Sequence, residues 1–146
     1  MRALMFAVFA LAACASAPVD QPAADASQNS APRAARINAD TARLESELHA
    51  SGVVAVGLGE TADLGGGLTV KPLEVLEDSR CPQDVTCVWG GRLRLRAEVS
   101  GAAQEFTLGQ PLETAQGVVT LAVVSPGAWS QWPNSKPPYR FGFRRG

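Results

Sequence analysis

The residue types best suited to chemistry in this 146-residue chain are its cysteines, at positions 14, 81 and 87. Cys81 and Cys87 enclose five residues within the stretch SRCPQDVTCVWGG, residues 79–91. Such a pair can bind a metal, switch between redox states, or form a structural disulfide. Structural zinc sites use four ligands at narrower spacing, and redox pairs use C-x-x-C beside a βαβ unit. The spacing therefore favours a structural disulfide over a redox switch, and a metal site is favoured least.

Residues suited to acid–base catalysis are few. The single histidine, His49, precedes the β-rich part of the chain. Glu77 and Asp78 are adjacent, so on a strand their side chains would point to opposite faces, and we expect both to be solvated turn residues. The segment GLGETA, residues 57–62, lacks the third glycine of a dinucleotide-binding fingerprint. The sequence thus predicts a protein that is not an enzyme and that has no cofactor or metal.

A basic stripe is the first candidate for a binding surface. Arg92, Arg94 and Arg96 occupy alternate positions, which on a strand places them on one face. Such a stripe can bind an anionic partner such as the phosphates of lipopolysaccharide. The interpretation we favour is the ordinary solvated face of a strand, paired across the sheet with acidic residues.

Two tryptophans are the second candidate. Trp129 and Trp132 lie in a Pro-rich loop within residues 125–141. Exposed rings there would stack on sugar or peptide. The alternative, which we favour, is that they fold back onto a small core that needs cover.

The N-terminus predicts export. Arg2 precedes an apolar run of about 11 residues, which is typical of a signal peptide and shorter than the ~20 residues that span a bilayer. The run ends in LAAC, residues 11–14, which resembles a bacterial lipobox. The resemblance implies removal of residues 1–13, a diacylglycerol thioether on Cys14, and an acyl chain such as palmitate on its amine. Several acyl chains are needed because one binds a membrane only marginally.

The residues after the lipobox bear on where the protein goes. Ala15, rather than aspartate, follows Cys14, which under the lipoprotein sorting rule implies the outer membrane, facing the periplasm. Residues 15–17, ASA, offer an alternative site for ordinary signal cleavage, which Pro18 disfavours. Both routes lead out of the cytoplasm, where Cys81 and Cys87 can be oxidised.

Composition divides the rest of the chain. Removal of the signal peptide takes away Arg2 and leaves 12 basic and 14 acidic residues. This balance of charge does not indicate a protein that binds nucleic acid. Residues 14–36 are rich in Ala, Pro and Ser, which predicts a disordered lipid-anchored linker of roughly 25 Å, holding the domain clear of the headgroups. Residues 37–52 predict a short helical arm, capped by Asn38 or Asp40.

The residue pattern of 53–146 is typical of a β domain, with turn-forming residues between short predicted strands. The clearest alternation runs over residues 85–99, where Cys87 and Trp89 share the apolar face with later leucines, so we expect both to point into the core. Pro72 predicts a bulge or an edge. About six strands and no strong helix indicate an all-β fold, a small antiparallel sandwich or barrel.

Residues 77–91, EDSRCPQDVTCVWGG, resemble a motif of small secreted or lipid-anchored bacterial proteins. In that motif an acidic-Ser-Arg-Cys-Pro turn leads through a second cysteine into a Trp-containing strand. The resemblance implies a shared β domain and a shared disulfide, and it brings no activity with it.

These observations together predict a cell-envelope lipoprotein whose domain is a non-catalytic binding or structural module. The expected partners are the membrane, through the lipid, and an envelope protein or anionic glycolipid. The alternative is a periplasmic inhibitor of a hydrolase, such as a lysozyme or protease, that inserts segment 125–138.

Overall fold

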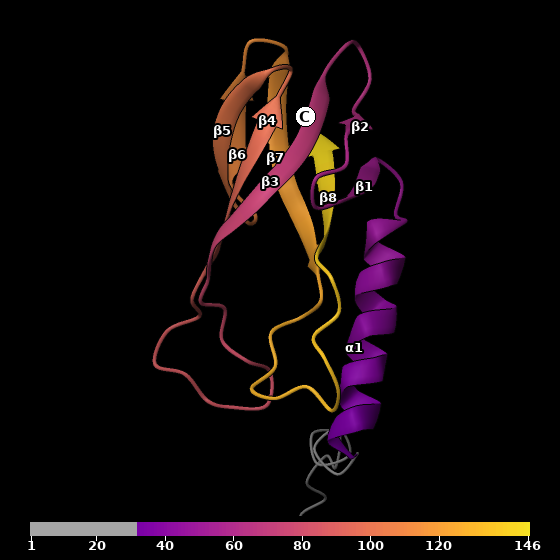
Figure 1. Ribbon diagram of the computed structural model, residues 1–146, viewed down its shortest axis with the longest axis vertical. Coiled ribbons are helices and arrows are strands. Elements are labelled where there is room, and N and C mark those ends of the chain that lie inside the picture. Colours follow the sequence, from indigo (N-terminus) through magenta and orange to yellow (C-terminus); the bar gives the residue numbers. More distant parts are fainter. Residues whose placement is uncertain (1–31) are drawn as a thin grey trace, which may run out of the picture. The chain divides into compact units, whose positions relative to one another are not determined.

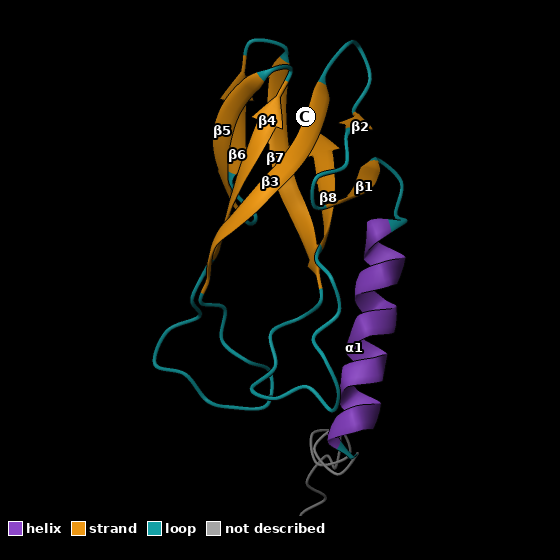
Figure 2. Ribbon diagram, in the orientation of Figure 1, coloured by secondary structure: helices purple, strands orange, loops and turns teal. Residues whose placement is uncertain are grey.

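The computed structural model describes residues 32–146. The predicted signal peptide, Cys14 and most of the predicted linker lie outside the described residues. The described elements, in chain order, are α1 (Arg33–Leu48), β1 (Val53–Gly57), β2 (Ala62–Asp63), β3 (Thr69–Asp78), β4 (Leu93–Val99), β5 (Ala102–Thr107), β6 (Pro111–Thr114), β7 (Gly117–Ser125) and β8 (Arg140–Arg145). Figure 1 shows their arrangement, and Figure 2 separates helix, strands and loops by colour.

The strands form two antiparallel sheets of four, in the orders β1-β8-β7-β6 and β2-β3-β4-β5. Alternate residues of both sheets meet in one apolar core, in which Phe106 of β5 and Phe143 of β8 pack edge to face at 5.3 Å. The predicted antiparallel sandwich is therefore confirmed. It has two strands more than the six expected, because the short β2 and β6 carry too few residues to show a period.

The alternation of residues 93–99 is confirmed as β4, whose Leu93, Leu95, Ala97 and Val99 are all buried. The bulge predicted at Pro72 is also confirmed, since the register between β3 and β4 shifts between Pro72 and Glu74. The shift lets the chain pass a residue that has no backbone donor for the ladder.

The helix differs from expectation at its start. α1 begins at Arg33, four residues before the predicted arm, and neither Asn38 nor Asp40 caps it. Helical structure therefore extends into the segment that composition assigned to the linker, because packing against the domain stabilises a helix that propensity alone leaves marginal.

The helix packs on the outer face of the first sheet. Leu44 and Leu48 contact Val123 of β7, and Glu45 accepts hydrogen bonds from Ser125 and Arg140. Gly142 of β8 permits this close approach, because a Cβ there would lie 2.8 Å from a methyl group of Val53 and 3.1 Å from one of Leu48. The predicted arm is thus an integral layer of the domain.

Candidate functional site at the loop end

Two long connections and the start of α1 gather at one end of the strands (Figure 1). We call this region the loop end: residues 79–92 between β3 and β4, residues 126–139 between β7 and β8, and residues 33–40 of α1. Gln83 donates a backbone hydrogen bond of 3.0 Å to Ala128, which joins the two connections directly. The loop end therefore behaves as one structure built from three parts of the chain.

A disulfide between Cys81 and Cys87 closes part of the first connection, with the two Cα atoms 6.0 Å apart. Backbone hydrogen bonds from Ser79 to Arg92 and from Cys81 to Gly90, both 2.9 Å, hold its two arms side by side. Gly91 makes this possible: its φ is +67°, and a Cβ there would lie 1.7 Å from the Ser79 carbonyl oxygen. These covalent, hydrogen-bonded and steric constraints fix residues 79–92, which we call the disulfide loop.

The prediction that Cys87 and Trp89 point into the core is wrong. β4 begins only at Leu93, Cys87 is exposed, Val88 is fully exposed, and Trp89 is 59% exposed. Pairing with β3 ends at the partners Asp78 and Leu93. The positive φ of Gly91 then turns the backbone out of extended geometry, so the period of two that holds from Leu93 onward does not reach back into the loop.

Trp129, a candidate ligand residue for which we favoured folding back onto the domain, is 8% exposed and lies against α1, as that favoured interpretation predicts. Its indole Nε1–H donates to the Asp40 carboxylate at 3.1 Å, and the Arg36 guanidinium lies 5.8 Å from the ring centre. Gly127 leaves room for the pair, because a Cβ there would lie 2.0 Å from an oxygen of Asp40. Trp132 is half-buried. Trp129 therefore joins segment 126–139 to α1 and is too buried to form part of a ligand surface.

Asp84 joins all three parts of the loop end. It accepts hydrogen bonds from the Ser130 hydroxyl at 2.6 Å and from the Ser130 backbone at 2.9 Å. It also pairs with Arg33 at 3.3 Å, and Arg33 donates to Gln131 at 2.9 Å. The bonds from Ser130, with the Arg33 charge nearby, hold the pKa of Asp84 below its usual value. This carboxylate therefore stays ionised and structural.

Asp78, expected to be a solvated turn residue, is the centre of a second network. Arg80 donates to it through two nitrogens, at 2.7 and 2.9 Å, and also to the Pro126 carbonyl at 3.0 Å. The Tyr139 hydroxyl donates to Asp78 at 2.6 Å, and Lys136 lies 3.4 Å away. Burial opposes ionisation of Asp78, but the bonds from Arg80 and Tyr139 outweigh it, so the pKa of Asp78 lies far below its usual range.

The basic stripe is paired along its length. Arg92 contacts Glu77 at 2.9 Å, Arg94 contacts Glu105, and Arg96 lies 3.3 Å from Glu74. Each arginine lies opposite a carboxylate of a neighbouring strand or of the end of β3, as expected for the solvated face of a sheet. An anionic ligand would have to displace these carboxylates, so the stripe is a weaker binding candidate than the loop end.

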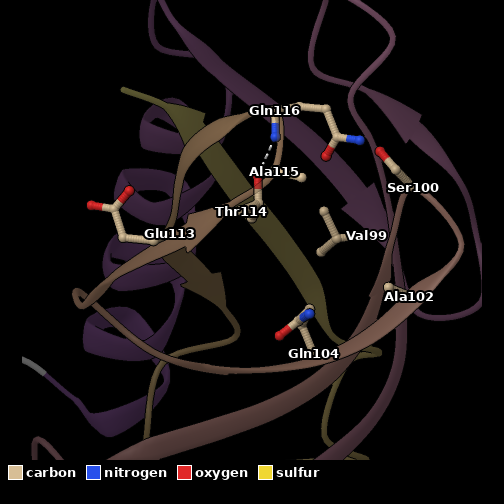
Figure 3. A pocket seen from close by; sticks show the side chains of 8 residues that line it. All are labelled: Val99, Ser100, Ala102, Gln104, Glu113, Thr114, Ala115 and Gln116. Carbon is tan, nitrogen blue, oxygen red and sulfur yellow. Dashed lines mark hydrogen bonds between the residues drawn. The ribbon is translucent and has the colours of Figure 1, made fainter.

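A shallow cavity of about 390 Å³ lies between the β4–β5 and β6–β7 turns, away from the loop end. Figure 3 shows its lining residues, among which Glu113 extends away from the other labelled side chains. Gln116 donates a backbone hydrogen bond to the Thr114 hydroxyl at 3.3 Å. The groups that face the cavity are amides, hydroxyls and methyl groups, and they provide no nucleophile activated by a base.

His49 is the C-cap residue that follows α1, and its Nδ1 lies 3.0 Å from the Glu45 carbonyl oxygen.

Within residues 32–146, no helix has the length and hydropathy to cross a bilayer. The chain gives no match to models of protein families, to curated proteins or to solved structures.

We expect removal of the disulfide to weaken the domain without unfolding it. Replacing Cys81 and Cys87 together with serine lengthens the unconstrained chain in the unfolded state, which lowers the free energy of unfolding by roughly 2.4 kcal/mol on the loop-entropy model. Urea denaturation measures the change. Reductant should produce the same loss in the unmodified protein and none in the double variant; equal midpoints in all samples would contradict a stabilising disulfide.

Proposed function

We propose that the protein is a bacterial cell-envelope lipoprotein, anchored through Cys14 in the outer membrane and displaying a non-catalytic β-sandwich to the periplasm as a binding or structural module. The observation that carries the proposal is the Cys81–Cys87 disulfide. It accounts for two of the three cysteines, and a structural disulfide is typical of an oxidising compartment. Cys14 then remains for lipid modification, at the end of an apolar leader with a lipobox-like LAAC.

The engagement of the carboxylates favours a module over an enzyme. Asp40 and Asp84 belong to the loop end and Asp78 ends β3 beside it, and each is an acceptor that holds loops together. A general base has to be free to take a proton, whereas the low pKa of Asp78 reflects strong structural bonds. The loop end is therefore better suited to presenting a fixed surface than to turnover.

Substituting Cys14 with serine tests the anchor. The unmodified protein should sediment with membranes and require detergent for release, whereas Cys14→Ser should accumulate as unprocessed precursor or appear in the soluble periplasmic fraction. The double variant Cys81→Ser/Cys87→Ser is the matched control and should stay with the membrane. An unchanged membrane fraction for Cys14→Ser would contradict the lipoprotein assignment.

A periplasmic hydrolase inhibitor is the second candidate. Segment 125–138 suits insertion poorly, since Pro126, Gly127 and Trp129 are buried. The disulfide loop suits it better, because a loop constrained by the disulfide, with the exposed Val88 and Trp89 directly after Cys87, can enter an active site with little loss of conformational entropy. Purified protein should then inhibit lysozymes or proteases in a dose-dependent way that Trp89→Ser abolishes; unaffected rates across a panel would remove this candidate.

A further inference from the structure

The tip of the disulfide loop is unusual for its exposed apolar side chains. Among residues 32–146, the large hydrophobic side chains with high exposure are Leu58, Leu73, Val85, Val88 and Trp89. Three of these five lie within five consecutive residues of the loop between β3 and β4: Val85 lies between the two cysteines, and Val88 and Trp89 directly follow Cys87. Clustered exposure of this kind marks an interaction site more often than isolated surface leucines do.

The position of the first residues of the domain indicates which partner the tip contacts. α1 begins at Arg33, and Arg33 contacts both Asp84 and Gln131, so the first described residues lie within the loop end. Seventeen residues, 15–31, lie between Cys14 and Pro32. A random coil of that length has a root-mean-square span of about 23 Å, and a fully extended chain of that length reaches about 60 Å. A lipid on Cys14 would therefore hold the loop end, rather than the opposite turns, close to the bilayer.

The charges at the loop end suit an anionic surface. Arg33 is 45% exposed, whereas the Asp84 carboxylate that pairs with it is 1% exposed. Lys136 is likewise well exposed beside Asp78, which is largely covered. Asp40 is buried under Trp129. In both ion pairs the carboxylate is covered and the cation is exposed, so these pairs present positive charge at the loop end. Anionic phospholipid headgroups attract such groups, and tryptophan favours the interface between headgroups and acyl chains.

We propose that the tip of the disulfide loop, Val85, Val88 and Trp89, inserts into the surface of the bilayer in which the protein is anchored, with Arg33 and Lys136 at the level of the anionic headgroups. This inference rests on the proposed lipid anchor at Cys14. Three side chains bind a membrane only weakly, but the anchor supplies an effective concentration in the millimolar range. The loop end of the domain therefore faces and contacts the membrane. This orientation replaces the expectation that the linker holds the domain clear of the headgroups.

Fluorescence quenching by brominated lipids tests the insertion. The full-length lipoprotein is reconstituted in vesicles of phosphatidylethanolamine and phosphatidylglycerol whose acyl chains are brominated near the headgroup. Trp129 is buried and Trp132 half-buried, so the difference between the unmodified protein and Trp89→Phe isolates the emission of Trp89. We expect the brominated chains to reduce that difference signal at least twofold. Replacing phosphatidylglycerol with phosphatidylcholine should weaken the quenching.

A charged residue at the tip provides the matched variant. Val88→Glu should cut the quenching of Trp89 at least twofold, because a carboxylate resists entry into an anionic interface. Leu73→Glu places the same charge on an exposed position of β3 and should leave the quenching unchanged. Equal effects of the two variants would contradict insertion of the tip.

Co-sedimentation separates the two proposals. If the anchor is wrong, the protein does not sediment with the vesicles at all. If the anchor is right and the docking wrong, the protein sediments but the emission of Trp89 is unaffected by brominated chains, and that result overturns the inference and leaves a protein partner as the occupant of the tip.

Discussion

Replacing Trp129 with alanine is expected to lower the free energy of unfolding by about 3–5 kcal/mol, the largest effect of any single substitution considered for this domain. The indole is 8% exposed, fills the space between segment 126–139 and α1, and donates to the carboxylate of Asp40. Its removal leaves a cavity and also takes a hydrogen-bond partner from a buried carboxylate, which adds to the cost. Urea denaturation followed by circular dichroism measures the loss.

Two variants separate the contributions at this position. Trp129→Phe keeps most of the buried ring but loses the donor to Asp40, so it should cost about 1–3 kcal/mol. Trp132→Ala removes the half-buried neighbour from the same segment and should cost less than Trp129→Ala. If Trp132→Ala proves as destabilising as Trp129→Ala, the assignment of Trp129 as the residue that joins loop and helix is wrong.

Asp78→Asn is expected to lower the free energy of unfolding by about 2–4 kcal/mol at pH 7, because it leaves Arg80 and Lys136 without their carboxylate. The loss should depend on pH. Since the pKa of Asp78 is lowered by folding, its contribution to stability is fully present above the unfolded pKa of about 4 and declines as the pH falls toward the lower folded value. The gap between the unmodified protein and Asp78→Asn should therefore hold from pH 7 to about 5 and narrow below pH 4.

Glu77→Gln is the matched control for Asp78→Asn. Glu77 is adjacent in sequence, accepts from Ser79 and pairs with the exposed Arg92, so its replacement should cost much less stability than Asp78→Asn. Denaturation midpoints measured from pH 2 to pH 7 provide the comparison. A gap for Asp78→Asn that stays constant in acid would show that the network is not held by the ionised carboxylate.

The parts of the fold that follow from local pattern were predictable from the sequence. Alternation over residues 93–99 identified β4, and the spacing of Leu44 and Leu48 identified the apolar side of α1. Pro72 marked the bulge. In each case the signal is a repeat or a backbone restriction carried by the residues themselves, and tertiary packing agrees with it.

The disulfide of the loop end and the folding back of Trp129 were predictable from the sequence, but the contacts that build the loop end were not. Alternation suggested that Trp89 is buried, and it failed because the backbone turns at Gly91, whose φ is not encoded in the pattern of apolar residues. The bond between Asp40 and Trp129 joins residues 89 positions apart, and the network of Asp78 and Tyr139 joins residues 61 positions apart. No local signal reports such pairs, since they depend on how the two connections and α1 are brought together.

The exposures of Trp89 and Trp129 change where on the domain binding is expected. Sequence composition drew attention to Trp129 and Trp132, yet Trp129 is buried and Trp89 is the exposed ring. The disulfide loop, which we expected to be purely structural, therefore also carries the exposed tryptophan ring. A rigid closed loop presents apolar side chains at small entropic cost on binding, so both roles can belong to the same residues.

The mass of the intact protein extracted from membranes is the most direct test of the lipid anchor. We predict a chain that begins at Cys14 and carries the additional mass of a diacylglyceryl group and an amide-linked acyl chain, with two hydrogens fewer than the reduced form because Cys81 and Cys87 are joined. A mature chain that begins at Pro18, or one that retains Met1 without lipid, would contradict the anchor and with it the proposed role at the membrane.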